Sequence, residues 1–261
     1  MRSSSLLLSA IMNRTFAIGD IHGELQTLRK LLGRLPTLGP DDTLVFLGDY
    51  VDRGPESRQT VEFLRHTLPQ ETGARLVALL GNHEDGWLRH VREGGWPEFV
   101  VPQSNGCMEC VRSYLGTTAP PNDERPSKEE FGALLSGTAL PEDVLAWMAS
   151  LPHWFEDDHA IYVHACLPER DGRWLHPGEV EDHHALLWER SAAFFREYQG
   201  KRVVCGHTPV VTLPQEISEY TPLDPTDLFQ HGSVLAIDTG CGKGGFLTAV
   251  ELPAGLVYES R

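Results

Sequence analysis

Stretches of strand length and of helical periodicity alternate along much of the chain. Short apolar runs typical of strands occur at residues 14–19, 43–47, 75–80, 160–165, 202–205, 233–237 and 246–251. Apolar residues at helical spacing occur at 24–35, 57–68 and 181–198. The early order of strand, helix, strand, helix, strand predicts parallel pairing, whereas the late strands lack intervening helices and are expected to pair antiparallel. The pattern therefore predicts an α/β fold with mixed sheets.

The regular alternation weakens between about residues 94 and 150. Glycines and prolines interrupt it there, and helix-like pieces remain near 127–136 and 141–150. We interpret this segment as a cap inserted into a single domain that spans 14–261. Residues 1–13 are predicted to be a disordered extension, since a signal peptide would need a small-residue cleavage site before the first strand. Either Met1 or Met12 could be the true start.

The composition predicts a globular protein with an acidic surface. The chain has 261 residues, of which 41% are hydrophobic, enough for a substantial core. Its formal net charge is −15, from 37 Asp and Glu against 22 Lys and Arg, which disfavours binding to nucleic acid or to an anionic membrane. An anionic substrate then needs a strongly positive local site, such as bound metal ions. No stretch approaches the about 18 apolar residues of a membrane span, and we expect a cytoplasmic protein.

The five cysteines do not form the even set of a secreted disulfide framework, and we interpret them as reduced thiols. Cys107 and Cys110 have the spacing of half a zinc site, but no second such pair or closely placed histidine pair completes it. Cys166, Cys205 and Cys241 lie close to the motif loops described below. They are either ordinary core thiols or a source of redox sensitivity near the site.

Two of the apolar strands end in the dipeptide Gly-Asp. The sequence GDIHG at 19–23 offers a carboxylate, Asp20, and an imidazole, His22, that can reach one cation. Taken alone, it is also compatible with a turn in which Asp caps a helix. The sequence GDYVDRG at 48–54 ends the next strand in the same way. Because strand ends in α/β folds converge on one edge of the sheet, we expect the two motifs to lie together.

The second motif carries groups suited to phosphate chemistry. The carboxylate of Asp49 has two oxygens and can bridge two cations, while the planar guanidinium of Arg53 can bind two phosphate oxygens at once. A surface ion pair between Asp52 and Arg53 is the alternative, although adjacent residues in a strand point to opposite faces.

Further candidate ligands end the following strands. In GNHE at 81–84, Asn82 provides a neutral oxygen and His83 can donate a proton near neutral pH. His164 ends another apolar run, and His207 begins the sequence His-Thr-Pro after a further one. A lone histidine is more often structural than a ligand. A set of His, Asp and Asn without thiolate, however, suits manganese, iron or zinc held as a pair with open positions for water and substrate.

The blocks GDIHG, GDYVDRG, GNHE, a strand-end His and GHTP, in this order, closely resemble the phosphoprotein phosphatase family of metallophosphoesterases over about residues 15–250. The resemblance implies a sandwich of two mixed β-sheets flanked by helices, with two divalent metal ions, manganese being the expected metal, at the sheet ends. The implied ligands are Asp20, His22 and His207 for one metal, Asn82 and His164 for the other, and Asp49 as the bridge.

The resemblance also implies which residues act on the substrate. Asp52 is expected to orient His83, and Arg53 to bind the phosphoryl group. A second arginine is expected just after a Trp on a later helix; Arg190 matches, with a solvated helix face as the alternative. A hydroxide shared by the two metals would attack phosphorus directly, and His83 would protonate the departing oxygen.

Leu80 stands before GNHE, where many protein-directed members of the family carry Arg, and the bacterial members that include diadenosine tetraphosphate hydrolases resemble the chain there. The intact pair Asp52-Arg53 and the spelling GNHE favour the protein-phosphatase branch instead. We therefore predict a phosphomonoesterase acting on phosphoserine and phosphothreonine proteins, like the bacterial serine/threonine protein phosphatases. The alternative is a dinucleoside polyphosphate hydrolase or another enzyme for small phosphate esters. A non-catalytic binding module would lack ligands or arginines, and nucleic-acid cleavage would need a basic stripe; neither pattern occurs.

Overall fold

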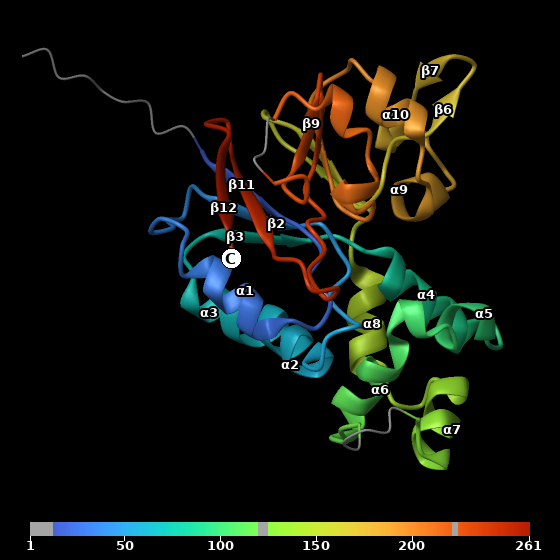
Figure 1. Ribbon diagram of the computed structural model, residues 1–261. Helices are drawn as coiled ribbons and strands as arrows, with labels where there is room; N and C mark the ends of the chain where they lie inside the picture. The colour runs from blue at the N-terminus through green and yellow to red at the C-terminus, as the bar shows by residue number, and fades with distance from the viewer. Residues whose placement is uncertain (1–12, 120–124, 221–223) are drawn as a thin grey trace, which may run out of the picture.

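The computed structural model describes residues 13–119, 125–220 and 224–261, so the predicted extension at 1–13 lies, apart from Asn13, outside the described residues. Two five-stranded sheets pack face to face at the centre of the molecule (Figure 1). The strands of the first sheet are β1 (Thr15–Ile18), β2 (Thr43–Phe46), β3 (Arg75–Ala78), β11 (Thr248–Leu252) and β12 (Leu256–Glu259). The strands of the second sheet are β4 (Trp154–Glu156), β5 (Ile161–Val163), β8 (Val203–Cys205), β9 (Phe229–His231) and β10 (Val234–Ala236). A small hairpin joins β6 (Glu169–Arg170) to β7 (Arg173–Trp174).

Both sheets are mixed. The first has the order β12-β11-β1-β2-β3, in which β1, β2 and β3 are parallel and β11 pairs antiparallel with β1 and with β12. The second has the order β4-β5-β8-β10-β9, in which β5, β8 and β10 are parallel. The prediction of antiparallel late strands is thus confirmed for β11 and for the pairing of β10 with β9, but it is wrong for the pairing of β10 with β8, which is parallel because the chain crosses back between β8 and β10.

Alternation of side chains along the strands builds a four-layer molecule. Phe16 and Ile18 face the helices that cover the first sheet, whereas Ala17 faces the second sheet. In β5, Ile161 faces its covering helices and Tyr162 faces the first sheet. Because both faces of these strands are buried, their sequences read as continuous apolar runs, and their polar residues are confined to the ends.

Helices cover the outer face of each sheet. The elements on the first sheet are α1 (Leu25–Leu32), α2 (Ser57–Glu62), the π-helical turn η1 (Phe63–Thr67) and α3 (Leu68–Glu71). On the second sheet they are α9 (His184–Trp188), α10 (Ala192–Glu197) and the 3-10 turns η3 (Pro177–Glu179), η4 (Val210–Thr212) and η5 (Gln215–Ile217). The single helix predicted at 181–198 is therefore two helices, since the chain is extended at Glu189 and Ser191, where the Ser191 hydroxyl caps α10.

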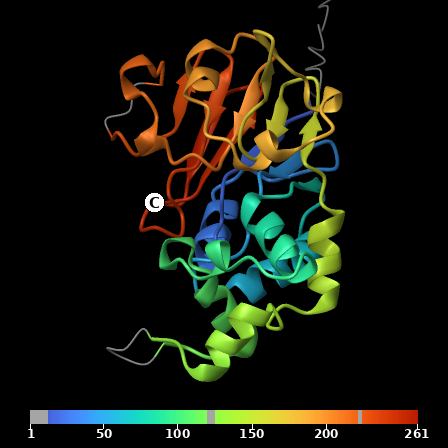
Figure 2. The same cartoon turned by 90° about the vertical axis from the view of Figure 1, so that its right-hand side faces the viewer.

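The predicted cap is helical. It contains α5 (Pro97–Val100), the 3-10 turn η2 (Gln103–Asn105), α6 (Cys107–Leu115), α7 (Lys128–Ser136) and α8 (Glu142–Ser150), and it follows α4 (Asn82–Arg92). Figures 1 and 2 show α6 and α7 at the end of the molecule opposite the second sheet. Helices α5 and α6 were not predicted, because nearby glycines and prolines interrupt the periodic pattern, whereas α7 and α8 lie where helices were predicted. In the described part of the chain, no helix is both long and apolar enough to cross a membrane.

Candidate metal centre

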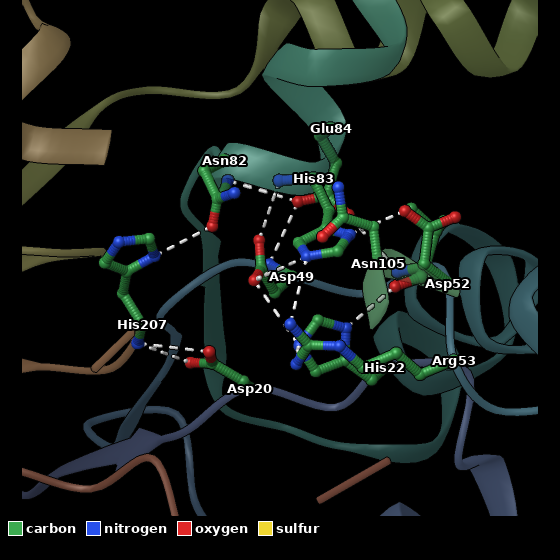
Figure 3. Close-up of polar contacts among 12 residues, drawn as sticks. Asp20, His22, Asp49, Asp52, Arg53, Asn82, His83, Glu84, Asn105 and His207 are labelled. Carbon is green, nitrogen blue, oxygen red and sulfur yellow. Dashed lines mark hydrogen bonds and ion pairs between the residues drawn. The ribbon is translucent and has the colours of Figure 1, made fainter. Parts of the chain in front are cut away.

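The loops that follow the central strands of both sheets meet at one point. Figure 3 shows Asp20, His22, Asn82, His83 and His207 arranged around Asp49. These residues come from the ends of β1, β2, β3 and β8, so the convergence expected from the sequence is present. All of them are at least 94% buried, as is His164 at the end of β5.

Asp49 is the centre of this group. Its Oδ2 lies 3.4 Å from Nε2 of His22, and its Oδ1 lies 3.4 Å from Nε2 of His164. The backbone N–H of His83 donates to Oδ1 at 2.9 Å. The potential ligand atoms fall into two sets that share Asp49, one with His22 and His83 and one with His164 and His207, and within each set all of these atoms lie within 4.8 Å of one another. A carboxylate placed between two sets of imidazoles is the arrangement of a dinuclear metal site.

The tautomers of two histidines prepare them to bind metal. The ring Nδ1–H of His22 donates to the carbonyl of Val51, and that of His164 donates to the carbonyl of Leu47, each at 2.9 Å. Burial lowers the pKa of both imidazoles, so they are neutral and the Nε2 lone pair of each faces Asp49. Backbone carbonyls thus hold both rings in the form that coordinates a cation.

His207 and Asn82 present a second convergence of lone pairs. Nε2 of His207 lies 3.2 Å from the carbonyl of Trp188, to which its N–H donates, and burial lowers the pKa of the ring. Its Nδ1 then carries a lone pair, which points at Oδ1 of Asn82 across 2.8 Å, while Nε2 of His164 lies 3.0 Å from the same oxygen. Three acceptors facing one another without a hydrogen between them fit a cation. The ring of His207 lies with Asn82 and His164, whereas its backbone N–H binds Asp20, so its predicted grouping with His22 stays a prediction.

Buried carboxylates give the centre an excess of negative charge. Burial and the neighbouring charges of Asp238 and Asp49 raise the pKa of Asp20 well above its usual value. Burial likewise raises the pKa of Asp238, which is only 3% exposed. Groups that ordinarily ionise at low pH are thus held where ionisation is costly, and divalent cations would relieve this cost.

Backbone strain is concentrated at the same place. Six residues other than glycine have a positive φ in the described part of the chain, and five of them are predicted site residues. The five are His22, Asp49, Asp52, Arg53 and His207, with φ between 50° and 71°. Such conformations cost about 1–3 kcal/mol each and persist where the surroundings over-determine them. The strained backbone at these residues therefore lowers the stability of the fold and directs their side chains towards the centre.

His83 and Asp52 form a pair, as the resemblance implied. Nδ1–H of His83 donates to Oδ2 of Asp52 at 2.6 Å, which leaves Nε2 directed towards the centre, 3.9 Å from Oδ2 of Asp49. Two residues that the sequence did not indicate as partners of Asp52 also donate to its carboxylate. The indole N–H of Trp87 donates to Oδ1 at 2.9 Å, and the thiol of Cys107, at the start of cap helix α6, donates to Oδ2 at 3.4 Å.

Arg53 lies at the edge of the group of residues around Asp49, with its guanidinium beside the rings of His22 and His83. The Nε of Arg53 is buried without a hydrogen-bond partner among the described residues, as suits a group that binds an added anion. The cap fixes its backbone, because the N–H of Arg53 donates to the carbonyl of Gly106 at 3.0 Å. A Cβ on Gly106 would lie 2.5 Å from that nitrogen, so only glycine allows this approach. Arg190 is exposed and follows α9; it donates to the carbonyl of His207 at 3.3 Å.

Glu84 and Lys243 are further site residues to which the sequence analysis gave no role. The buried carboxylate of Glu84 accepts backbone N–H groups from Asp49, Tyr50, Val51 and Gly81, and so fixes the turn that carries Asp49. Its position three residues after Gly81 is the capping-box spacing, which was a usable signal. Lys243 lines the surface beside Arg53 and had no local signal.

All five cysteines are free and buried. Burial raises the pKa of Cys166 to about 12 and raises that of Cys205 and Cys241 as well. Thiols in this state are poor nucleophiles, which favours the interpretation as core residues over redox sensitivity.

Comparisons with known proteins agree with this geometry. Residues 14–211 match the family described as calcineurin-like phosphoesterase. The chain is 25% identical over 286 residues to a symmetrical bis(5'-nucleosyl)-tetraphosphatase of Methylococcus capsulatus, with 91% of each chain covered. It is 29% identical over 257 residues to an asymmetrical bis(5'-nucleosyl)-tetraphosphatase of Halalkalibacterium halodurans, covering 90% of this chain and 89% of the relative.

Among solved structures, a metallophosphoesterase from Sphaerobacter thermophilus has the same fold, with a TM-score of 0.51, 18% identity, and coverage of 94% of this chain and 87% of that chain. The predicted fold of two mixed sheets flanked by helices is thereby confirmed. A buried Asp49 between two sets of imidazoles, on a chain matched by this family over most of its length, identifies the protein as a member of the calcineurin-like phosphoesterases, with a site arranged for two metal ions.

Proposed function

We propose that this protein hydrolyses the phosphoanhydride chain of dinucleoside polyphosphates. The observation that carries the proposal is similarity along nearly the whole chain to relatives named bis(5'-nucleosyl)-tetraphosphatases, in which about 90% of each partner is aligned. This favours the alternative of the sequence analysis over its main prediction of a protein phosphatase. Leu80 is consistent with the choice, since it is 4% exposed and places an apolar side chain where many protein-directed members carry arginine.

In this proposal two divalent cations are held by six side chains, with manganese favoured, and iron or zinc as alternatives, for a set of imidazole, carboxylate and amide ligands. The ligands are Asp20, His22, Asp49, Asn82, His164 and His207. The cations would lower the pKa of a water molecule and neutralise charge on the phosphoryl oxygens.

The side chains around the ligands bind and protonate the substrate. Arg53, with its unpartnered Nε, binds non-bridging phosphate oxygens, and Arg190 approaches from the side of His207. Asp52 holds His83 with Nε2 towards the reacting group, where it donates a proton to the leaving oxygen.

The chemistry of the leaving group distinguishes an anhydride from an ester. Water oxygen bonds to one phosphorus, the bridging P–O bond breaks, and the protons of water pass to the product phosphates or to solvent. The leaving oxygen belongs to a phosphate, whose second pKa is about 6, so it departs with little need of an acid. An alkyl ester releases a far more basic alkoxide and depends on His83 more strongly.

The test is a comparison of kcat/KM for the manganese-loaded protein. Diadenosine tetraphosphate, phosphoserine, phosphothreonine and phosphotyrosine peptides, p-nitrophenyl phosphate and single-stranded DNA are assayed together. We expect diadenosine tetraphosphate to exceed every phosphopeptide at least tenfold, and the DNA not to be cleaved. A preference for a phosphopeptide would reject the proposal and restore the protein-phosphatase prediction.

Two controls complete the assay. Chromatography of the products separates a pair of ADP molecules, expected for the symmetrical cut, from ATP and AMP. Asp49→Asn and chelator-treated protein should both lose turnover, because the substitution removes charge that holds the cations and the chelator removes the cations themselves. Full activity in excess chelator would contradict the metal requirement.

A further inference from the structure

Two cavities adjoin the site, and both are lined by the cationic side chains of Arg53 and Lys243. The first, which we call the cap cavity, has a volume of about 590 Å³ and lies between the cap and the loop of Gly242 and Lys243. The second, the C-terminal cavity, has a volume of about 560 Å³ and lies between the turn η4 and the segment from Asp238 to Phe246. Among the residues that the structure describes, Arg53 and Lys243 are the two that line both cavities. Each volume is within the range of small-molecule sites, roughly 300–1,000 Å³.

Both cavities expose apolar side chains. Six large hydrophobic side chains are exposed in the described part of the chain, namely Val101, Leu115, Phe131, Leu135, Val211 and Leu256. Val101 and Phe131 line the cap cavity, at 47% and 41% exposed, and Val211 lines the C-terminal cavity at 57%. Half of these exposed hydrophobic side chains thus line the two cavities that share Arg53 and Lys243. Clustering at a cavity, unlike scattered exposure, marks a binding site.

Polar groups complete the walls. In the cap cavity, Ser104 and the carboxylate of Glu109 stand beside the apolar residues, and Arg112 holds that carboxylate at 2.7 Å. In the C-terminal cavity, Thr226 and the ion pair of Arg261 and Asp224 likewise provide polar groups beside the apolar residues. An apolar wall with a few hydrogen-bonding groups suits a nucleoside, whose base has an apolar face and a polar edge.

The positive charges of Arg53 and Lys243 indicate which chemical group of a ligand lies between the two cavities. The protein has a net charge of −15 and repels anions in general, so Arg53 and Lys243 mark where an anionic group is accepted. Because these two cationic side chains are what the cavities share within the described part of the chain, a ligand that fills both needs an anionic centre and two bulky ends. A phosphopeptide has its phosphate on a side branch and lacks this form.

We propose that the cap cavity and the C-terminal cavity each bind one nucleoside of a dinucleoside polyphosphate, whose phosphate chain crosses Arg53 and Lys243. This inference deepens the proposed function and rests on it for the substrate class. It gives the cap a role in substrate recognition, with Phe131 as the residue that stacks on a base.

Binding separates this inference from catalysis. The dissociation constants of adenosine 5'-(α,β-methylene)diphosphate and of methylenediphosphonate, which has the same anionic group without a nucleoside, are measured by isothermal titration with manganese-loaded protein. We expect the nucleotide to bind at least tenfold more tightly. Base stacking on an aromatic ring corresponds to about 5- to 150-fold in affinity, so Phe131→Ala should reduce the selectivity ratio by about 5-fold or more.

The helix that carries Phe131 supplies the matched control. Leu135 is one turn further along α7, is 42% exposed, and lines neither cavity. Leu135→Ala should keep the selectivity ratio of the natural protein. Phe131→Leu, which keeps an apolar side chain without the aromatic face, should fall between the natural protein and Phe131→Ala. For the second cavity, Val211→Ser should raise KM for diadenosine tetraphosphate more than KM for adenosine tetraphosphate, which has a single nucleoside.

The outcomes distinguish the inference from the proposed function. Equal affinity for the two diphosphonates, or an unchanged ratio in Phe131→Ala, would overturn the nucleoside assignment even if diadenosine tetraphosphate is hydrolysed. Strong nucleoside selectivity in a protein that turns over phosphopeptides faster would support the cavities as nucleoside sites and reject the proposed function.

Discussion

The substitution Trp87→Phe tests whether the network behind His83 matters for turnover. Trp87 is fully buried in α4, and its indole N–H donates to Oδ1 of Asp52 at 2.9 Å. The other oxygen of Asp52 accepts Nδ1–H of His83 and the thiol of Cys107. Phenylalanine keeps an aromatic ring in the same place and removes the donor, so the carboxylate loses one of the groups that fix its plane.

The expected size follows from this geometry. A hydrogen bond to a charged group contributes about 1.5–3 kcal/mol, and the lost indole ring adds a packing cost, so the free energy of unfolding should fall by at least that amount. If about half of the hydrogen-bond energy holds His83 in the transition state, that is about 0.75–1.5 kcal/mol, kcat falls about 3- to 12-fold, since about 1.4 kcal/mol corresponds to a factor of ten. KM should change little, because Trp87 lies behind Asp52, away from the cavities.

The assay compares two leaving groups on protein shown to be folded by thermal denaturation. An alkyl phosphate depends on protonation of its alkoxide, so its kcat should fall more than that of p-nitrophenyl phosphate. Trp147→Phe is the control, because Trp147 is half-buried, packs on Tyr50 with ring centroids 5.6 Å apart, and makes no contact with Asp52 among those described. Equal losses on both substrates, or unchanged kcat in folded Trp87→Phe, would refute the reasoning.

Three further predictions address the acid, the metals and the fold. His83→Asn should reduce turnover of an alkyl phosphate by about 10²- to 10⁴-fold and that of diadenosine tetraphosphate less; steady-state kinetics giving equal losses would exclude His83 as the acid. Removal of metal with a chelator should lower the midpoint temperature of thermal unfolding, because buried Asp20 and Asp238 then repel each other. Added manganese should raise the midpoint with increasing concentration. A midpoint that does not change with manganese concentration would contradict this. Burial alone would raise the pKa of Asp42, but hydrogen bonds from Arg14 and Gly39 outweigh it and lower the pKa. The stabilisation is therefore present above pH of about 4 and lost as pH falls through the lowered folded-state pKa. Asp42→Asn should thus cost about 1 kcal/mol in urea unfolding at pH 7 and progressively less as the pH is lowered below about 4; a cost that does not change with pH would show that the charge is not responsible.

The local pattern was sufficient for the parts of the site that follow strands. Asp20, Asp49 and Asn82 each come directly after an apolar run, and a chain buried on both faces of a sheet can place polar side chains only at its ends. Their proximity could therefore be predicted without knowing how the sheets pack. The prediction that the late strands pair antiparallel was correct for β11 but missed the parallel pairing of β10 with β8, since the direction of a strand depends on where its connection crosses the sheet.

Substrate specificity was beyond the reach of short motifs. GDYVDRG and GNHE favoured protein substrates, whereas relatives aligned over 91% and 90% of the chain are named tetraphosphatases. The motifs describe metal and phosphate binding, which both classes of substrate share. The cavities that we propose for the remainder of the substrate lie in the cap and in the last loops, where the sequence had no periodic pattern.

The sequence by itself predicted an α/β fold with mixed sheets and placed Asp20, Asp49 and Asn82 at strand ends, because each of these depends on residue type within a few positions of a strand end. The sandwich of two sheets and the pairing of Asp52 with His83 were expected from the resemblance to a known family, and the structure contains both. Only the tertiary structure decided that Trp87 and Cys107 hold Asp52, that Gly106 fixes Arg53, and that Lys243 joins Arg53 between two cavities. These partners come from segments that pack together only in the folded chain, for example Cys107 at 55 positions from Asp52. Contacts at such separations depend on how the elements pack against one another, and that is a property of the folded chain as a whole.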